Sequence, residues 1–143
     1  MGANYKQLTK FTKQIEQLNK EQKEQFLQSC CKELAARLLA KVIKRTKSVT
    51  GTLRRGWTGG VKQSATEYAN SLDVRKVGSV YHIDITNPVE YASYYEYGHR
   101  TRNHQGWVQG HFTLTISEAE LNNMSDAILQ KKLNKFMKDV FEV

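Results

Sequence analysis

The sequence predicts an α+β fold in a single domain spanning residues 1–143, and three observations lead to this class. The chain has 143 residues, of which 39% are hydrophobic and 25% charged, which is typical of one folded domain. Apolar residues recur with helical spacing at both ends, and they alternate with polar residues in the middle. The predicted strands are grouped rather than interleaved with helices. We therefore expect N-terminal helices in 1–47, an antiparallel sheet of three to four strands with a short Tyr-rich helix in 48–113, and a long C-terminal helix in 114–143.

The first segment is predicted to be helical from Tyr5 to about Lys47, with a break near Asn19. Asn19 and Gln22 have the spacing of a helix-capping box, so a short helix should end before them and a longer one should begin there. The apolar stripe of the second helix comprises Phe26, Leu27, Cys30, Cys31, Leu34, Leu38, Leu39, Val42 and Ile43. Neighbouring side chains on a helix diverge, so Cys30 and Cys31 are expected to be unpaired, buried thiols.

The middle of the chain changes to strand-like patterns. Gly51, after Thr50, is expected to end the second helix, because glycine readily adopts the left-handed conformation found there. Strands are predicted over 57–63, 70–77 and 79–86, with the hairpin turn between the last two at 76–79. In the most regular strand, 80–85, the side chains of Tyr81, Ile83 and Ile85 should face one way.

Two further helices are predicted. Asn87 as N-cap, Pro88 at the first position and Gly98 as the stop indicate a helix from Pro88 to Tyr97. A polar loop, 99–105, and an extended segment, 106–113, should follow. The last helix should begin near Ser117, and its apolar stripe comprises Leu121, Met124, Ile128, Leu129, Leu133, Phe136, Met137 and Val140.

The net charge of +8 is concentrated near the N-terminus. Residues 1–47 hold 11 Lys/Arg against 4 Asp/Glu, whereas residues 113–143 hold 4 against 5. Such a bias favours DNA or an acidic protein partner, but a lysine-rich solvated helix face has the same composition. Candidate contacts with DNA or an acidic partner are Lys41, Lys44, Arg45, Arg54 and Arg55. No apolar run approaches the roughly 20 residues that span a bilayer, and the polar start lacks a signal-peptide core, so we expect no membrane partner and synthesis in the cytoplasm.

No motif predicts catalysis or a cofactor, and we assign no catalytic or metal-binding residue. The chain lacks a GxSxG elbow, a P-loop, an HExxH pair and a GxGxxG turn. His99, His104 and His111 lie within thirteen residues, but their spacings of 5 and 7 match no common zinc pattern. Loop histidines are the simpler interpretation, and a metal nuclease is a minor alternative.

Tyrosines crowd into the short helix. Tyr91, Tyr94 and Tyr95 share one face by their spacing, and a role in the core or in a subunit contact is favoured over stacking on nucleotide bases. We expect these tyrosines, Arg100, Arg102 and Trp107 to be interface residues, since aromatic residues and arginine are enriched at interface cores. The tyrosine helix with Arg100 and Arg102 should form one side of the contact. The segment 106–112 and the N-terminal helices should form or border the opposite interface.

Three short patterns in order carry a family resemblance. Thr50-Gly51-x-Leu53-Arg54 follows the long helix, Tyr91-Ala92-x-x-Tyr95-Glu96-x-Gly98 precedes the polar loop, and Gly106-Trp107-Val108-x-Gly110 precedes the last helix. Over roughly residues 25–140 the chain resembles the minor structural proteins at the head-tail junction of tailed phages and prophages, called neck, tail-completion or tail-terminator proteins. A proline usual near the last glycine in that family is absent, since Gln109 precedes Gly110.

The resemblance implies a non-enzymatic subunit of a virion or phage-tail-like particle, assembled in the bacterial host cytoplasm. It implies a homo-oligomeric ring with heterologous contacts, neighbouring neck or tail proteins as partners, and proximity to DNA. The alternative that the residues leave open is a small basic nucleic-acid-binding protein.

Overall fold

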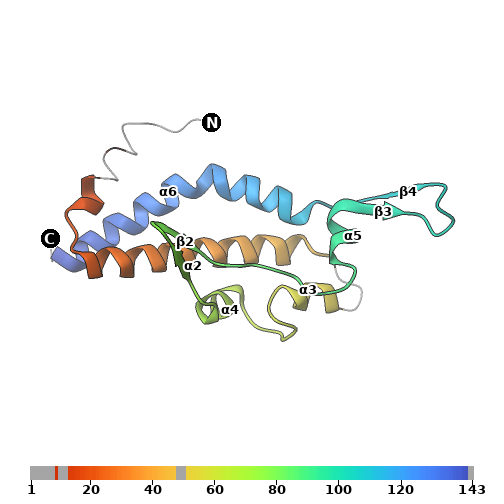
Figure 1. Cartoon of the computed structure of the whole chain (residues 1–143), viewed down its shortest axis with the longest axis horizontal. Helices are drawn as coiled ribbons and strands as arrows, with labels where there is room; N and C mark the ends of the chain where they lie inside the picture. The colour runs from red at the N-terminus through yellow and green to blue at the C-terminus, as the bar shows by residue number, and fades with distance from the viewer. Residues whose placement is uncertain (1–8, 10–12, 48–50, 142–143) are drawn as a thin grey trace.

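Two long helices form the body of the molecule. In this computed structural model, which describes residue 9, residues 13–47 and residues 51–141, α2 (Lys20–Arg45) and α6 (Thr113–Phe141) pack side by side. Figure 1 shows α3 (Thr52–Gly56) and α4 (Ala65–Ser71) on the side of α2 opposite α6. The remaining elements are β1 (Arg75–Val77), β2 (Val80–His82), α5 (Ala92–Tyr97), β3 (Gly98–Arg100) and β4 (Trp107–Gln109). This mixture of helices and antiparallel strands confirms the predicted α+β class.

The predicted start of the longer N-terminal helix is confirmed. The side chain of Asn19 accepts a hydrogen bond from Gln22 N at 2.9 Å, and Asn19 N donates to the side chain of Gln22 at 3.1 Å. Both bonds of a capping box are therefore present. Residues 13–16, before this cap, are helical. Residues 5–8 and 10–12 of the helix predicted from Tyr5 lie outside the described residues, as does Thr50.

The core divides into two clusters along α2. Near the end of α2, Leu39 and Val42 pack with Trp57 and Ala69, which places α3 and α4 against this helix. Near its start, Phe26 and Cys30 pack with Leu133 of α6, and the rings of Phe26 and Phe136 lie 5.1 Å apart. Each large side chain that is fully removed from water in this way contributes roughly 1.5–3 kcal/mol. Both cysteines are free thiols as predicted, with Cys30 buried and Cys31 half-buried.

The strand predicted over 57–63 is wrong. Trp57 is buried against α2 and its Nε1 donates to Thr46 Oγ1 at 3.0 Å, so the chain turns here instead of extending. Gly59 and Gly60 continue this turn with φ of 71° and 84°, values that side chains larger than hydrogen rarely permit. Gly51 has the predicted left-handed conformation, but it lies at the start of α3, because α2 has already ended at Arg45.

The strand predicted over 70–77 is mostly wrong as well. Ser64 Oγ accepts a hydrogen bond from Glu67 N at 3.1 Å, which starts α4, and this helix runs to Ser71. Only residues 75–77 form a strand, which pairs with β2 through the predicted hairpin turn, Val77 opposite Val80. Tyr81, Ile83 and Ile85 are half-buried with exposed residues between them, as predicted, although residues 83–86 lie outside any sheet.

The predicted single sheet of three to four strands is therefore corrected to two separate antiparallel pairs. β1 pairs with β2, and β3 pairs with β4, within the part of the chain that the structure describes. The predicted extended segment 106–113 contributes β4 only at 107–109. The two pairs do not join into one sheet. Trp57 and α4, which lie in segments where further strands were expected, pack against α2 instead.

Both late helices are confirmed, with shifted starts. α5 begins at Ala92 and not at Pro88, because Asn87 does not cap it: Asn87 Oδ1 accepts from Val89 N at 3.1 Å and Asn87 Nδ2 donates to Leu53 O at 2.8 Å. Gly98 ends α5 as predicted. α6 begins at Thr113, four residues before the predicted Ser117. None of the helices, within the described residues, combines the length and apolarity needed to cross a membrane.

Candidate assembly surface

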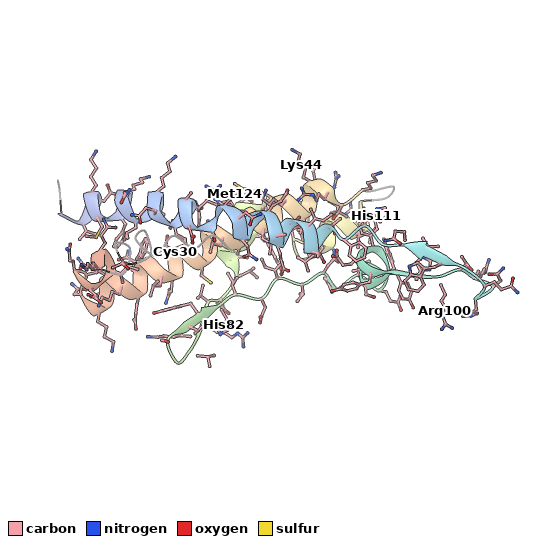
Figure 2. The ribbon with its side chains drawn as sticks, turned by 90° about the horizontal axis from the view of Figure 1, so that it is seen from above. Cys30, Lys44, His82, Arg100, His111 and Met124 are labelled. Carbon is pink, nitrogen blue, oxygen red and sulfur yellow. The ribbon has the colours of Figure 1, made fainter. Side chains whose placement is uncertain are left out.

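A two-stranded hairpin projects from one end of the body. We call residues 98–109, which contain β3 and β4, the arm. Figures 1 and 2 show the arm extending past α5 and beyond the ends of the two long helices, with Arg100 on it. Gly98 lies opposite Gln109, and Arg100 lies opposite Trp107. At the tip, Thr101 N donates to Gly106 O at 3.0 Å, which closes the loop.

Glycines allow the arm to join the body tightly. A Cβ atom on Gly110 would lie 2.3 Å from Glu96 O, and one on Gly98 would lie 2.4 Å from Val108 O. Two backbone hydrogen bonds continue the junction, from His111 N to Tyr95 O at 2.8 Å and from Phe112 N to Glu96 O at 3.0 Å. The close approach of these backbone segments leaves no room for side chains at either glycine, so α5, the arm and the start of α6 form one unit.

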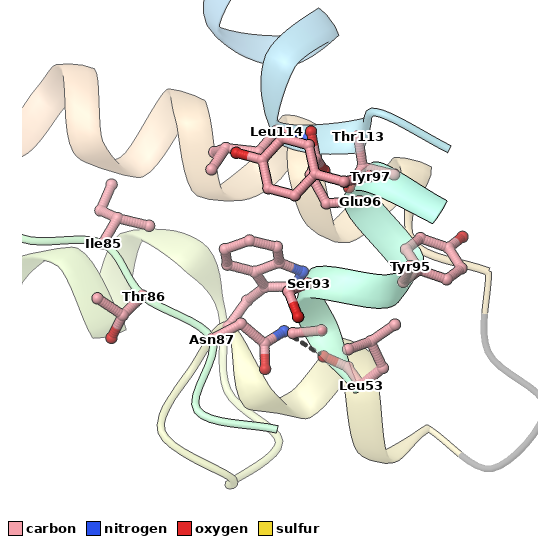
Figure 3. Close-up of a pocket in the computed structure, with 12 residues that line it drawn as sticks. Leu53, Ile85, Thr86, Asn87, Ser93, Tyr95, Glu96, Tyr97, Thr113 and Leu114 are labelled. Carbon is pink, nitrogen blue, oxygen red and sulfur yellow. Dashed lines mark hydrogen bonds between the residues drawn. The ribbon is translucent and has the colours of Figure 1, made fainter. Parts of the chain in front are cut away.

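The Glu96 carboxylate completes this unit by capping α6. It accepts hydrogen bonds from Leu114 N at 2.8 Å and Thr115 N at 3.0 Å, and from the hydroxyls of Thr113 and Thr115 at 2.9 and 2.8 Å. Figure 3 shows Glu96 beside Thr113 and Leu114. Burial alone raises the pKa of Glu96, but these hydrogen bonds outweigh it and the pKa is lowered. A buried negative charge thus satisfies the free N–H groups at the positive end of the helix.

Large apolar side chains are exposed on and beside the arm. We call Tyr91, Tyr94, Tyr97, Trp107 and Val108 the aromatic surface. Trp107 is 59% exposed and Tyr97 is 62% exposed, whereas aromatic residues usually bury most of their surface. Exposed apolar side chains that gather on neighbouring elements are typical of interaction sites.

The structure brings most of the predicted interface residues together. All of these are exposed: Tyr91 immediately before α5, Tyr94 on α5, and Arg100, Arg102 and Trp107 on the arm. Tyr95 differs, because it is half-buried: its ring stacks on His111 at 4.1 Å, and its hydroxyl accepts a hydrogen bond from Lys47 N at 2.8 Å. Tyr95 therefore links α5 to the end of α2.

Sequence reasoning missed three residues of this region. Tyr97 and Val108 belong to the aromatic surface, and Tyr97 could have been found from the run of tyrosines that contains it. Glu96 makes its contacts 17 to 19 residues along the chain. No local sequence pattern predicts a helix cap supplied by a residue so far away in the chain. Two threonines at the start of a helix are a weak indication of such a cap.

Lys41, Arg45 and Arg54, three of the predicted basic contacts, have side-chain interactions that hold their own subunit together. Arg45 donates to Glu120 and, at 3.1 Å, to Ser117 Oγ, and Lys41 Nζ lies 3.7 Å from Glu120, so both join α2 to α6. The hydrogen bond from Arg45 is the main reason why the pKa of Glu120 is lowered. The guanidinium of Arg54 donates to Thr46 O at 3.1 and 2.9 Å.

The other two predicted basic residues, Lys44 and Arg55, are exposed. Arg55 also has a contact within the chain. Of the five candidates, then, Lys41, Arg45 and Arg54 contribute to the packing of their own subunit.

The three clustered histidines lie apart. The ring of His99 packs on Tyr94 with centroids 5.3 Å apart, His111 stacks on Tyr95, and His104 lies in the loop of the arm with a φ of 58°. No three His, Cys, Asp or Glu side chains converge to hold a metal ion in the part of the chain that the structure describes.

A small pocket lies beside α5, and Tyr97 of the aromatic surface helps to line it. Its volume is about 150 Å³, and Figure 3 shows it between α3, α5 and the start of α6. Leu53, Trp57, Ile85 and Leu114 contribute apolar walls. Of its polar residues, Glu96 is engaged in the cap and Asn87 is bonded to Leu53 O, so both serve the fold.

Comparison with known protein families gives a match over more than half of the chain. Residues 9–98 match the family described as "Bacteriophage HK97-gp10, putative tail-component". No curated protein and no solved structure matches the chain. The matched region ends at Gly98, where β3 begins, so the rest of the arm lies beyond it.

Proposed function

Because the chain belongs to the HK97-gp10-like family of bacteriophage tail components, we propose that it builds an oligomeric ring at the neck or head-proximal end of the tail. The protein is a phage tail-related structural protein, associated with the virion or with a phage-tail-like particle. In the proposed role it joins heads to tails, or completes or terminates the tail. Its partners are further copies of itself and the neighbouring neck or tail proteins.

The single observation that carries this proposal is the aromatic surface on and beside the projecting arm. Trp107 and Tyr97 expose more than half of their surface to water, a state that subunit association would relieve. Strand pairing and the glycine junction already fix the conformation of the hairpin. Binding should therefore cost it little conformational entropy. A structural subunit needs such a rigid, adhesive surface and needs no reactive group.

Self-association of the purified protein tests the proposal. Trp107→Ala should shift the chain toward the monomer in light scattering coupled to size-exclusion chromatography, because truncation removes the largest exposed anchor. Val61→Ala is the matched control, since Val61 is 61% exposed but lies far from the arm along the chain. A wild-type protein that stays monomeric at every concentration would overturn the ring.

The position in the particle needs a separate experiment. Electron microscopy of particles made without this protein should show heads and tails that accumulate unjoined, or tails of abnormal length. Normal particles that lack this protein would contradict the role at the neck or at the end of the tail.

The alternative of a small nucleic-acid-binding protein has mainly the net charge of +8 in its favour. Arg45 and Lys41 pair with Glu120, so fewer basic side chains are available to phosphates than the 22 Lys and Arg in the sequence. We expect only weak, sequence-independent attraction to DNA, as suits a subunit beside a DNA passage. A gel-shift series in rising salt tests this expectation, and tight binding at physiological salt would favour the alternative.

A further inference from the structure

We propose that a row of three lysines on the outer face of α6 contacts the phosphate backbone of duplex DNA. We call Lys131, Lys135 and Lys138 the lysine row. This inference rests on the proposed function, in which the subunit lies beside a DNA passage, and it names the residues that meet the DNA. The row is distinct from the five basic residues expected from the sequence, three of which are engaged within the subunit.

Charge is divided between the two halves of α6. Residues 113–130 contain three acids, Glu118, Glu120 and Asp126, and no Lys or Arg, whereas residues 131–138 contain four lysines and no acid. An acid and a lysine four residues apart stabilise an exposed helix, while two lysines at this spacing repel each other. The segregation of charge therefore costs helix stability, which a bound polyanion would recover.

The helix dipole accounts for only one lysine of the row. Cations stabilise the last turn of a helix, and the effect falls off beyond that turn. α6 ends at Phe141, so Lys138 lies in its last turn. Lys131 and Lys135 lie ten and six residues before Phe141, outside the reach of this effect.

The lysine row is exposed and makes no ion pair within the described residues. Its spacings of four and three residues place the three side chains on one face of α6, opposite the buried Leu133. No described carboxylate lies within ion-pair distance of them, and this includes the exposed Asp139, four residues after Lys135. Three positive charges are thus available to a ligand.

The composition of this face favours DNA over an acidic protein. Among the described residues of α6, the exposed large apolar side chains are those of Ile116 and Met124, in its first half. Protein interfaces have apolar cores that are depleted in lysine, whereas phosphate contacts need only positive charge. Lysine also lacks the planar fork with which arginine makes bidentate contacts. The row therefore suits a contact that is independent of DNA sequence.

The length of the row fits duplex DNA. Lys131 and Lys138 are seven residues apart, which corresponds to about 10 Å along the helix axis. Over about 10 Å of duplex the two strands together present about six phosphates, since one occurs for every 1.7 Å or so. Three lysines therefore find more phosphates than they need.

The lysine row lies far from the arm. Figure 1 shows α6 running from its junction with the arm to the opposite end of the body, where it lies beside the start of α2. Lys131 is eighteen residues after Thr113, or about 27 Å along the helix. Subunit contacts made by the arm therefore leave the lysine row uncovered.

Binding of a short fluorescent duplex, measured by anisotropy in rising salt, tests the contact. The row variant combines Lys131→Gln, Lys135→Gln and Lys138→Gln, which keep good helix formers on an exposed face. Each lost phosphate contact reduces the slope of log affinity against log salt by about 0.9, so the slope should fall by about 2.7 for each bound subunit. Affinity at about 50 mM salt should fall more than tenfold.

A control variant of equal net charge separates this contact from general attraction. It combines Lys20→Gln, Lys47→Gln and Lys62→Gln, three exposed lysines outside α6. Its slope should change by less than about 1. Circular dichroism verifies that both variants are folded, and light scattering verifies that both associate like wild type.

Each outcome bears on the inference. A slope that falls in the row variant and not in the control supports the contact, whereas equal losses in the two variants overturn it, because net charge alone then attracts the DNA. If poly-glutamate binds wild type more tightly than the duplex does, and the row variant loses that binding, the row receives an acidic protein and the assignment to DNA is wrong.

Failure of this inference differs from failure of the proposed function. Wild-type rings that bind no duplex even at low salt would overturn the lysine contact and leave the ring in place. Wild-type protein that binds duplex through the lysine row but stays monomeric at every concentration would overturn the ring and support the contact.

Discussion

Removal of the Glu96 carboxylate should destabilise the protein more than any exposed glutamate does. In Glu96→Ala the N–H groups of Leu114 and Thr115 lose their acceptor, as do two threonine hydroxyls. Each unsatisfied buried donor costs about 1–3 kcal/mol, and part of this cost is recovered where water enters. We expect a loss of about 3 kcal/mol in the free energy of unfolding for Glu96→Ala, and about 2 kcal/mol for Glu96→Gln, which retains one acceptor but no charge.

Thermal unfolding followed by circular dichroism measures this effect. For a chain of this length, 1 kcal/mol corresponds to about 3 °C in Tm, so Glu96→Ala should lower Tm by about 10 °C. Glu118→Gln is the control: Glu118 is exposed on α6, the helix that Glu96 caps, and its replacement should change stability by less than about 0.5 kcal/mol. Equal Tm values for Glu96→Ala and Glu118→Gln would refute the capping role.

The pH dependence of the same variants gives a second readout. The pKa of Glu96 is lowered in the folded state, so its stabilising effect is complete above the ordinary value of 4.5 and is lost as the pH falls through the folded-state value. The Tm difference between wild type and Glu96→Gln should therefore be constant near neutral pH and shrink below about pH 4.5. A difference that grows on acidification would contradict the sign of the shift.

Three further predictions follow from the packing. Leu133→Ala removes a fully buried side chain and should cost about 2–5 kcal/mol in urea unfolding, whereas a loss below 1 kcal/mol would show that α6 does not depend on this contact. Gly110→Ala places a Cβ atom 2.3 Å from Glu96 O, so Tm should fall and self-association should weaken together; unchanged values for both would mean that the junction is loose. Burial raises the pKa of the Cys30 thiol to about 11 from 9.0, so alkylation of Cys30 in a Cys31→Ser variant at pH 8 should be about 100-fold slower than that of a free thiol, and a normal rate would show that the site is open.

The long elements could be predicted from the sequence because their signals are local. The spacing of Phe26, Cys30 and Val42 reports the buried face of α2, and Asn19 with Gln22 reports its start. The turn between Val77 and Val80 is likewise a local feature. Such patterns act within a few residues, so distant packing does not change them.

The middle of the chain was harder to predict because distant contacts decide it. Trp57 is of a residue type that favours strands, but its side chain packs on α2 and donates a hydrogen bond to Thr46. These contacts accompany a turn of the chain at this position. α4 had a signal that the strand interpretation overlooked, since Ser64 and Glu67 have capping-box spacing. Capping of α6 by Glu96 depends on contacts across the arm, and no window of neighbouring residues contains it.

The arm leaves and rejoins the body at the paired positions Gly98 and Gln109. Insertion or deletion of matched residues in both strands therefore alters its reach while the helices keep their places. Because the hairpin joins the body at this one pair of positions, its length and its side chains can change without a change in the packing of the body.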